Sequence, residues 1–148
     1  MSSKPPIGYV DVRVFVHATE NPEKVVTAVR NLLPSGLAET AKFEKSSLVG
    51  HHGNPITLFT TQLTDKKQLP FLLQKISEGL NALDKEKLNQ DIKLHLERHN
   101  LYLRFDKQSA FLEAFKLAQN DPIALKIHFK DKKPEEINEI LQSYGLLQ

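Results

Sequence analysis

The hydrophobic and polar positions of the chain follow two spacings, one typical of β-strands and one typical of helices. The segment YVDVRVFVHA at residues 9–18 alternates strictly, with valine at every second position. Because successive side chains of a strand point to opposite faces of a sheet, this pattern predicts a strand with one buried face and one mixed face. NLYLRFD at 100–106 and PIALKIHF at 122–129 alternate in the same way and predict two further strands.

Helical spacing follows the first strand and recurs in the middle and at the end of the chain. Asn21 and Pro22 are a suitable N-cap and first residue for a helix that ends near Pro34. Leucines and isoleucines from Lys66 onward predict a helix reaching Leu83, and Asp84 is the expected cap of the next one, which continues to about Leu96. Two more helices are expected at 107–118, capped by Asp106 with Ala110, Phe111, Ala114 and Phe115 buried, and from Pro134 to Gly145.

A hairpin is predicted around the sequence GHHGN at residues 50–54. The flanking segments 39–49 and 55–63 are rich in threonine, isoleucine and phenylalanine, and glycine and asparagine suit the turn between them. Strands and helices mix irregularly, so the predicted class is α+β, with a mixed or largely antiparallel sheet and helices packed on one face. We expect a single domain over residues 1–148, with residues 1–8 flexible.

Composition excludes several classes of function. The 148 residues include no cysteine, which excludes disulfide frameworks, thiolate catalysis and cysteine-rich zinc sites. No apolar run has the length of a signal peptide or a membrane helix, so we expect a soluble, cytoplasmic protein. The formal net charge of +2 is small, so any attraction to phosphate depends on how the charges are arranged.

One face of the predicted sheet carries candidate chemistry. If the aliphatic side chains of each strand point toward the helices, the opposite face collects cations and aromatic rings. Cations contact phosphates and flat rings stack on bases, so this mixture favours RNA. The simpler alternative is an ordinary half-exposed sheet with polar residues for solubility, and the RNP consensus of RNA-recognition domains is absent. The candidate RNA-binding residues on this face are Arg13, Phe15, His17, Tyr102, Arg104, Lys126 and His128.

The two adjacent histidines, His51 and His52, are the other notable feature. Side chains at consecutive positions usually diverge, and no H-x-x-x-H or H-x-H spacing accompanies them, so we expect no metal and no cofactor. With Asn54 they could contact RNA from the hairpin tip, or only form a hydrogen-bonded turn. In the first turn of the helix expected at 107–118, Lys107 and Gln108 could add contacts to RNA, while Asp106 is expected to cap that helix.

Three segments together resemble a known family: residues 11–34 (DVRVFVHATENPEKVVTAVRNLLP), 50–59 (GHHGNPITLF) and 100–111 (NLYLRFDKQSAF). They are similar to small archaeal RNA-binding proteins that are also regarded as a predicted subunit or accessory of the exosome. The fold of that family is related to the fold of the large-subunit ribosomal protein that binds 5S RNA. The resemblance covers nearly the whole chain and implies an α+β sandwich with RNA and exosome subunits as the expected partners. It implies no catalytic residues.

These observations favour a noncatalytic RNA-binding protein. Two alternatives remain open from the sequence. A protein adaptor in an RNA-processing complex would use the same open face to contact another subunit. A nuclease or hydrolase would use His51 or His52 together with Asp106.

Overall fold

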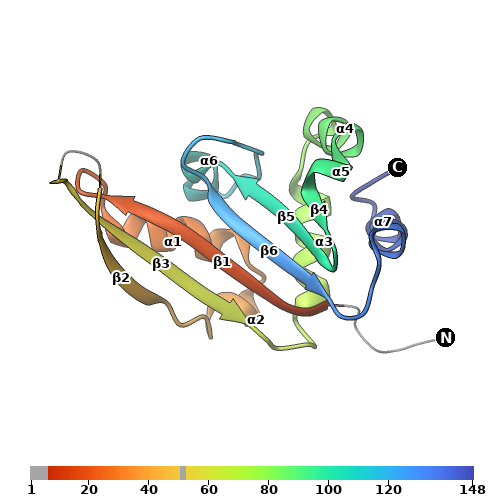
Figure 1. The fold of residues 1–148 in the computed structure, drawn as a ribbon, viewed down its shortest axis with the longest axis horizontal. Helices are drawn as coiled ribbons and strands as arrows, with labels where there is room; N and C mark the ends of the chain where they lie inside the picture. The colour runs from red at the N-terminus through yellow and green to blue at the C-terminus, as the bar shows by residue number, and fades with distance from the viewer. Residues whose placement is uncertain (1–6, 51–52) are drawn as a thin grey trace.

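The computed structural model describes residues 7–50 and 53–148, which form one antiparallel sheet with helices against one side (Figure 1). Within these residues the sheet has six strands in the order β2-β3-β1-β6-β5-β4. The predicted α+β class with a two-layer arrangement is therefore confirmed. The strands are β1 (Ile7–His17), β2 (Glu44–Val49), β3 (Pro55–Leu63), β4 (Leu96–Glu97), β5 (Asn100–Phe105) and β6 (Ile123–Phe129).

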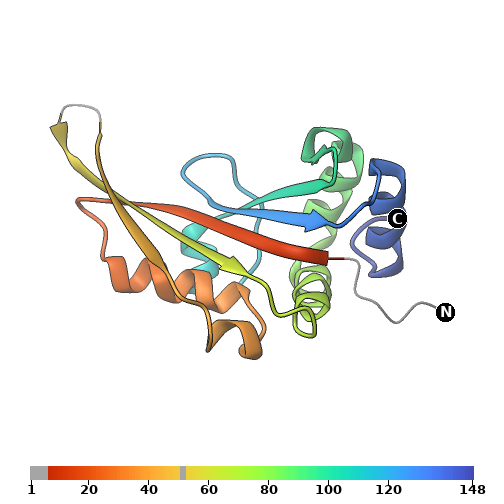
Figure 2. The same ribbon diagram turned by 60° about the horizontal axis from the view of Figure 1, so that its bottom comes forward.

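The helices connect the strands mainly on one side, so that α1, α2 and α3 lie beneath the sheet in Figure 2. The first of them begins as predicted, since the Asn21 side chain accepts hydrogen bonds from the backbone N–H groups of Glu23 and Lys24. The helices are α1 (Pro22–Leu32), α2 (Ser35–Ala38), α3 (Leu69–Gly79), α4 (Ala82–Gln90), α5 (Ile92–His95), α6 (Lys107–Phe111) and α7 (Pro134–Ser143).

The core lies between the helices and the aliphatic face of the three central strands. Every predicted inward position of these strands is at most 3% exposed. Because apolar area removed from water contributes about 25 cal/mol per Å², this face is a main source of stability. The alternation in the sequence therefore identified the buried face correctly. Its members are Val10, Val12, Val14 and Val16 in β1, Leu101, Leu103 and Phe105 in β5, and Ile123, Leu125, Ile127 and Phe129 in β6.

The predicted hairpin is present as β2 and β3. Its turn is closed by hydrogen bonds from Gly50 N–H to the Asn54 carbonyl and from Gly53 N–H to the Gly50 carbonyl, and Gly53 has a φ of +76°. The strand before the turn begins at Glu44, later than predicted, because the chain at 39–41 still continues the turn of α2 through a bond from Ala41 N–H to the Leu37 carbonyl. His51 and His52 lie outside the described residues.

The middle of the chain differs from the prediction in its helix boundaries. Asn81, not Asp84, caps α4, because the Asn81 Oδ1 atom accepts a hydrogen bond of 2.7 Å from the Asp84 N–H. The helix expected to reach Leu83 ends as α3 at Gly79, and Leu83 is an exposed residue of α4. The single helix expected to reach Leu96 is divided into α4, which ends at Gln90, and α5, which ends at His95, and Leu96 begins β4 by pairing with Leu101. Pairing with a neighbouring strand has overridden the helical spacing here.

The helix predicted over 107–118 is also too long. Asp106 is its N-cap as predicted, but α6 ends at Phe111, and Ala114 is exposed rather than buried. The following chain turns at Glu113, which has a φ of +63°, and pairs its backbone with the end of β5 through the hydrogen bond from Asp106 N–H to the Lys116 carbonyl. These long-range bonds compete with helix continuation and cannot be read from local spacing.

Both ends of the described chain pack onto the domain. Ile7 and Gly8, at the end of the segment expected to be flexible, belong to β1, and Ile7 is buried. Residues 1–6 lie outside the described residues. The final helix, α7, begins at Pro134 as predicted, buries Ile137 and Leu141, and ends at Ser143, two residues before the predicted end at Gly145. Within the described part of the chain, no helix combines the length and apolarity that crossing a membrane requires.

Candidate nucleic-acid interface

Strand pairing brings the predicted cations of three strands into two neighbouring rows. Arg13 in β1 pairs with Ala124 in β6, which pairs with Arg104 in β5. Directly paired residues of an antiparallel sheet project from the same face, so both arginines flank one alanine. In the next row Lys126 lies between Asp11 and Tyr102. We call the face that carries these two rows the open face.

The open face is accessible at its centre. Arg13 and Arg104 are exposed, and the small side chain of Ala124 leaves a depression of about 370 Å³ between them. Among the described residues, neither arginine takes part in an ion pair. The nearby carboxylate of Asp11 accepts a hydrogen bond from the Gln62 side chain. Unpaired arginines beside a shallow floor are suited to binding phosphate oxygens.

Aromatic rings cover one end of the open face. Tyr9 and His128 stack with ring centroids 4.6 Å apart, and the Lys126 ammonium lies 5.9 Å from the Tyr9 ring. His128 Nδ1 donates to the Asn100 Oδ1 atom at 2.8 Å. Burial, followed by the neighbouring charges of His99 and Lys126, lowers the pKa of His128. At neutral pH His128 therefore presents a neutral ring, which suits stacking better than phosphate binding.

The hairpin end of the open face holds the other predicted β1 residues. Phe15 is 37% exposed and pairs with Leu58 of β3, and His17 pairs with Ile56. His17 Nε2 also lies 3.1 Å from a carboxylate oxygen of Asp121. These side chains share the face of Arg13 but continue it toward the hairpin, where Asn54 is exposed.

Lys107 has a different environment from the one predicted. Its ammonium donates to the Phe15 carbonyl at 2.6 Å, to Glu20 at 3.0 Å and to Asp121 at 2.8 Å, and its side chain is only 13% exposed. The neighbouring Gln108 is exposed. The ammonium group of Lys107 therefore connects α6 to the end of β1 and to Asp121, which precedes β6. It is not free on the surface.

A possible metal cluster coincides with this ammonium. His17, Glu20 and Asp121 each have a ligand atom within 4.8 Å of the others. Lys107 already donates to both carboxylates, so it neutralises the charge that a cation would otherwise balance. The close approach of these three side chains is therefore explained by their ion pairs with Lys107 and with each other.

Replacing Lys107 with methionine is expected to destabilise the domain. The substitution keeps most of the side-chain volume but leaves Glu20, Asp121 and the Phe15 carbonyl without their donor, which costs about 1–3 kcal/mol of unfolding free energy. Urea unfolding followed by circular dichroism measures this. Gln108→Ala is the matched control at the adjacent exposed position, with an expected change below about 0.5 kcal/mol. A Lys107→Met protein as stable as the wild type would show that the network contributes nothing.

Asp106 has the structural role predicted for it. Its carboxylate accepts hydrogen bonds from the N–H and the hydroxyl of Ser109, at 2.9 and 2.8 Å. These two bonds lower the pKa of Asp106, outweighing its partial burial. The side chain is thus a cap for α6, and its ionised form is the one that the fold stabilises.

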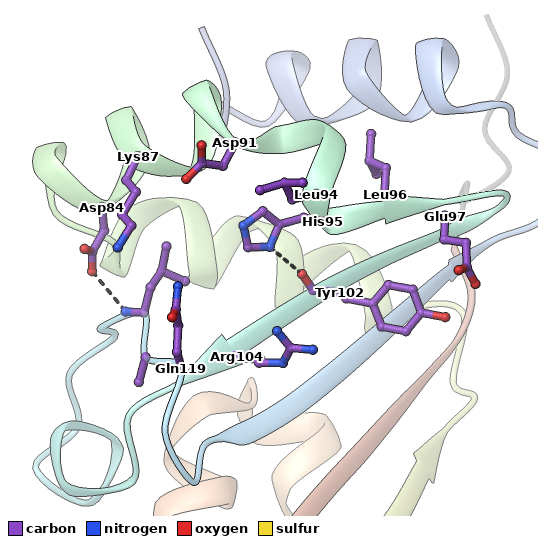
Figure 3. Close-up of a pocket in the computed structure, with 12 residues that line it drawn as sticks. Asp84, Lys87, Asp91, Leu94, His95, Leu96, Glu97, Tyr102, Arg104 and Gln119 are labelled. Carbon is purple, nitrogen blue, oxygen red and sulfur yellow. Dashed lines mark hydrogen bonds between the residues drawn. The ribbon is translucent and has the colours of Figure 1, made fainter.

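A second cavity, which the sequence did not predict, adjoins the open face. We call it the α5 pocket: a space of about 610 Å³ between α4, α5, β5 and the loop at 117–119 (Figure 3). The side chain of His95 projects into it, and its Nδ1 atom lies 2.9 Å from the Tyr102 carbonyl oxygen. Tyr102 and Arg104 line both this pocket and the central depression. Its remaining members come from segments whose proximity no local pattern indicates.

Comparisons with known proteins agree with the geometry. Residues 9–129 match the model of a family described as RNA binding. The RNA-binding protein PAB1135 of Pyrococcus abyssi is 30% identical over 125 residues, covering 83% of this chain and 79% of that protein. The uncharacterized protein MJ0213 of Methanocaldococcus jannaschii is 29% identical, covering 89% and 93%. The solved structure of Mth689 from Methanothermobacter thermautotrophicus superposes with a TM-score of 0.77 at 30% identity, covering 93% of this chain and 97% of that one.

Proposed function

The chain belongs to the RNA-binding family, and from this premise we propose that it binds RNA through the open face of its sheet, without cleaving it. The binding residues are Arg13, Arg104 and Lys126 for the phosphates, and the exposed ring of Phe15 and the half-buried ring of Tyr102 for the bases. The proposal also includes contacts with RNA from His51, His52 and Asn54 of the predicted hairpin tip, from His17 and His128 on the outer parts of the face, and from Gln108 in α6. Lys107 contributes by holding Phe15 and α6 in place.

The row of Arg13, Ala124 and Arg104 carries this proposal. Two arginines on separate strands flank a residue too small to cover the space between them, and Lys126 follows in the next row. Arginine donates several N–H groups in a planar fork, so two of them at the rim of one depression can hold consecutive phosphates of a strand. The aromatic residues on either side supply surfaces on which unstacked bases lie.

RNA binding of the wild-type chain should fall steeply with salt. Each phosphate contact releases counterions, so three cations predict a slope of about −2 to −3 in a plot of log affinity against log salt concentration. Electrophoretic shift or anisotropy titrations with structured RNA at several salt concentrations measure this slope. Absence of binding to any RNA at low salt would refute the proposal.

The same samples test the catalytic alternative. RNA incubated with the chain, with and without divalent ions, is expected to stay intact, because Asp106 is engaged by Ser109 as a cap. Cleavage that is lost in His52→Ala would establish the nuclease alternative instead.

Association with the exosome and the relation to the 5S-RNA-binding ribosomal protein remain predictions of the family resemblance. Exosome subunits that co-purify with the chain after nuclease treatment would support a direct contact. Subunits that are lost after nuclease treatment would show that RNA bridges them, which is what an RNA-binding function predicts.

A further inference from the structure

The α5 pocket gives the open face a means of selecting among RNA sequences. We infer that this pocket takes one unstacked nucleobase that carries an exocyclic amino group, namely adenine, cytosine or guanine in preference to uracil. The inference rests on the proposed RNA binding and adds a specificity site to it.

Continuity with the phosphate-binding rows is the first reason. Arg104 and Tyr102 line both the central depression and the α5 pocket. If a phosphate of the RNA contacts Arg104, the base of that nucleotide lies beside the mouth of the pocket. Proteins that read RNA sequence usually take up bases that have left the stack, because the edges of such bases are free for hydrogen bonds.

The charges around the pocket favour a base over a phosphate. Three carboxylates line it, from Asp84, Asp91 and Glu97, against the two cations Lys87 and Arg104. Without counting His95, the two positive and three negative charges leave one net negative charge, which disfavours phosphate. Within the described residues none of the ion pairs involves these five side chains. Their acceptor oxygens are thus available to the amino group of a base, apart from the Asp84 oxygen that accepts from the Leu117 N–H.

His95 adds an oriented acceptor. A carbonyl oxygen can only accept, so the contact with the Tyr102 carbonyl requires the hydrogen of the neutral ring to be on Nδ1. Nε2 then carries a lone pair, and Figure 3 shows this second nitrogen on the side of the cavity where Gln119 lies. An amino group of adenine, cytosine or guanine can donate to Nε2, whereas the single N–H donor on the edge of uracil lies between two carbonyl oxygens, which the carboxylates of the pocket repel.

The size and walls of the pocket also fit a base. Its volume of about 610 Å³ lies within the range of small-molecule sites. The Leu94 side chain at its rim is 83% exposed and offers an apolar contact to a base. The Arg104 guanidinium and the Tyr102 ring are flat groups on which a base can lie.

Hairpin RNAs that share one stem and differ only in loop sequence test the inference. Loops composed entirely of A, C or U are titrated by anisotropy at one salt concentration. The wild type is expected to bind the A and C loops about tenfold more tightly than the U loop, as one lost base contact implies. His95→Ala and Asp91→Asn should each bring this ratio close to one. The slope of log affinity against log salt concentration should be the same in His95→Ala as in the wild type, because the proposed phosphate contacts are Arg13, Arg104 and Lys126.

Glu135→Gln, at an exposed position of α7, is the control and should keep the wild-type ratio. Asp91→Asn preserves side-chain shape, so it tests the inference even if His95→Ala weakens the contact between α5 and β5. Equal binding of all three loops by the wild type, or a base preference that survives both substitutions, would overturn the inference while leaving the proposed RNA binding intact. Failure to bind any loop would overturn both.

Discussion

Replacing both Arg13 and Arg104 with alanine should weaken RNA binding by about 10- to 100-fold at moderate salt. Hydrogen bonds to charged groups contribute about 1.5–3 kcal/mol each, and solvent exposure lowers the contribution of each of these two arginines to about 1 kcal/mol. The slope of log affinity against log salt concentration should also become shallower by about two, since each lost phosphate contact removes about one unit. Anisotropy titrations of the double variant and the wild type over a salt series measure both quantities.

The matched control for this loss of charge is the pair Lys66→Ala and Lys67→Ala. These exposed lysines lie between β3 and α3, outside the open face, and their removal lowers the net charge by the same amount. A uniform attraction between a basic protein and RNA would be reduced equally by both double substitutions. If the lysine control weakens RNA binding as much as the arginine pair, the open face is not the binding surface.

The arginine variant should also keep its fold. Both side chains are exposed on the face opposite the helices and hold no ion pair among the described residues, so the unfolding free energy should change by less than about 0.5 kcal/mol for each substitution. This separates lost contacts with RNA from lost structure.

Phe105→Ala should have the largest effect on stability, lowering the unfolding free energy by about 3–5 kcal/mol. Phe105 is fully buried at the end of β5, and its ring contacts that of Phe115 edge to face, with centroids 5.4 Å apart. The substitution removes this contact and leaves a cavity beneath the strand that carries Tyr102 and Arg104. Chemical denaturation at neutral pH measures the change.

Phe15→Ala is the contrasting substitution in the same sheet. Phe15 lies on the open face and is 37% exposed, so the expected loss of stability is only about 1 kcal/mol. RNA binding should nevertheless fall several-fold, because the ring is one of the proposed stacking surfaces. The opposite pattern, with Phe15 needed for folding and Phe105 dispensable, would contradict the assignment of the two faces.

Much of the fold was predictable because its causes are local. Alternation along β1, β5 and β6 follows from the geometry of a single strand, and the Asn21 and Asp106 caps involve only neighbouring residues. The predictions failed where distant segments compete with local spacing. Leu96 leaves its helix to pair with Leu101, and the chain after Phe111 leaves its helix to bond to the end of β5.

Local pattern alone sufficed to place Arg13, Tyr102, Arg104 and Lys126 on the face opposite the aliphatic residues, since a side chain's face depends only on its position within its own strand. Strand order and register, which arise from contacts between segments far apart in the chain, were needed to make Arg13 and Arg104 neighbours across Ala124. The same long-range packing paired the charge of Lys107 with Glu20 and Asp121 and brought α5 beside Tyr102 to form a pocket. Such pairings depend on the packing of the whole domain, so no short window of residues contains the information that specifies them.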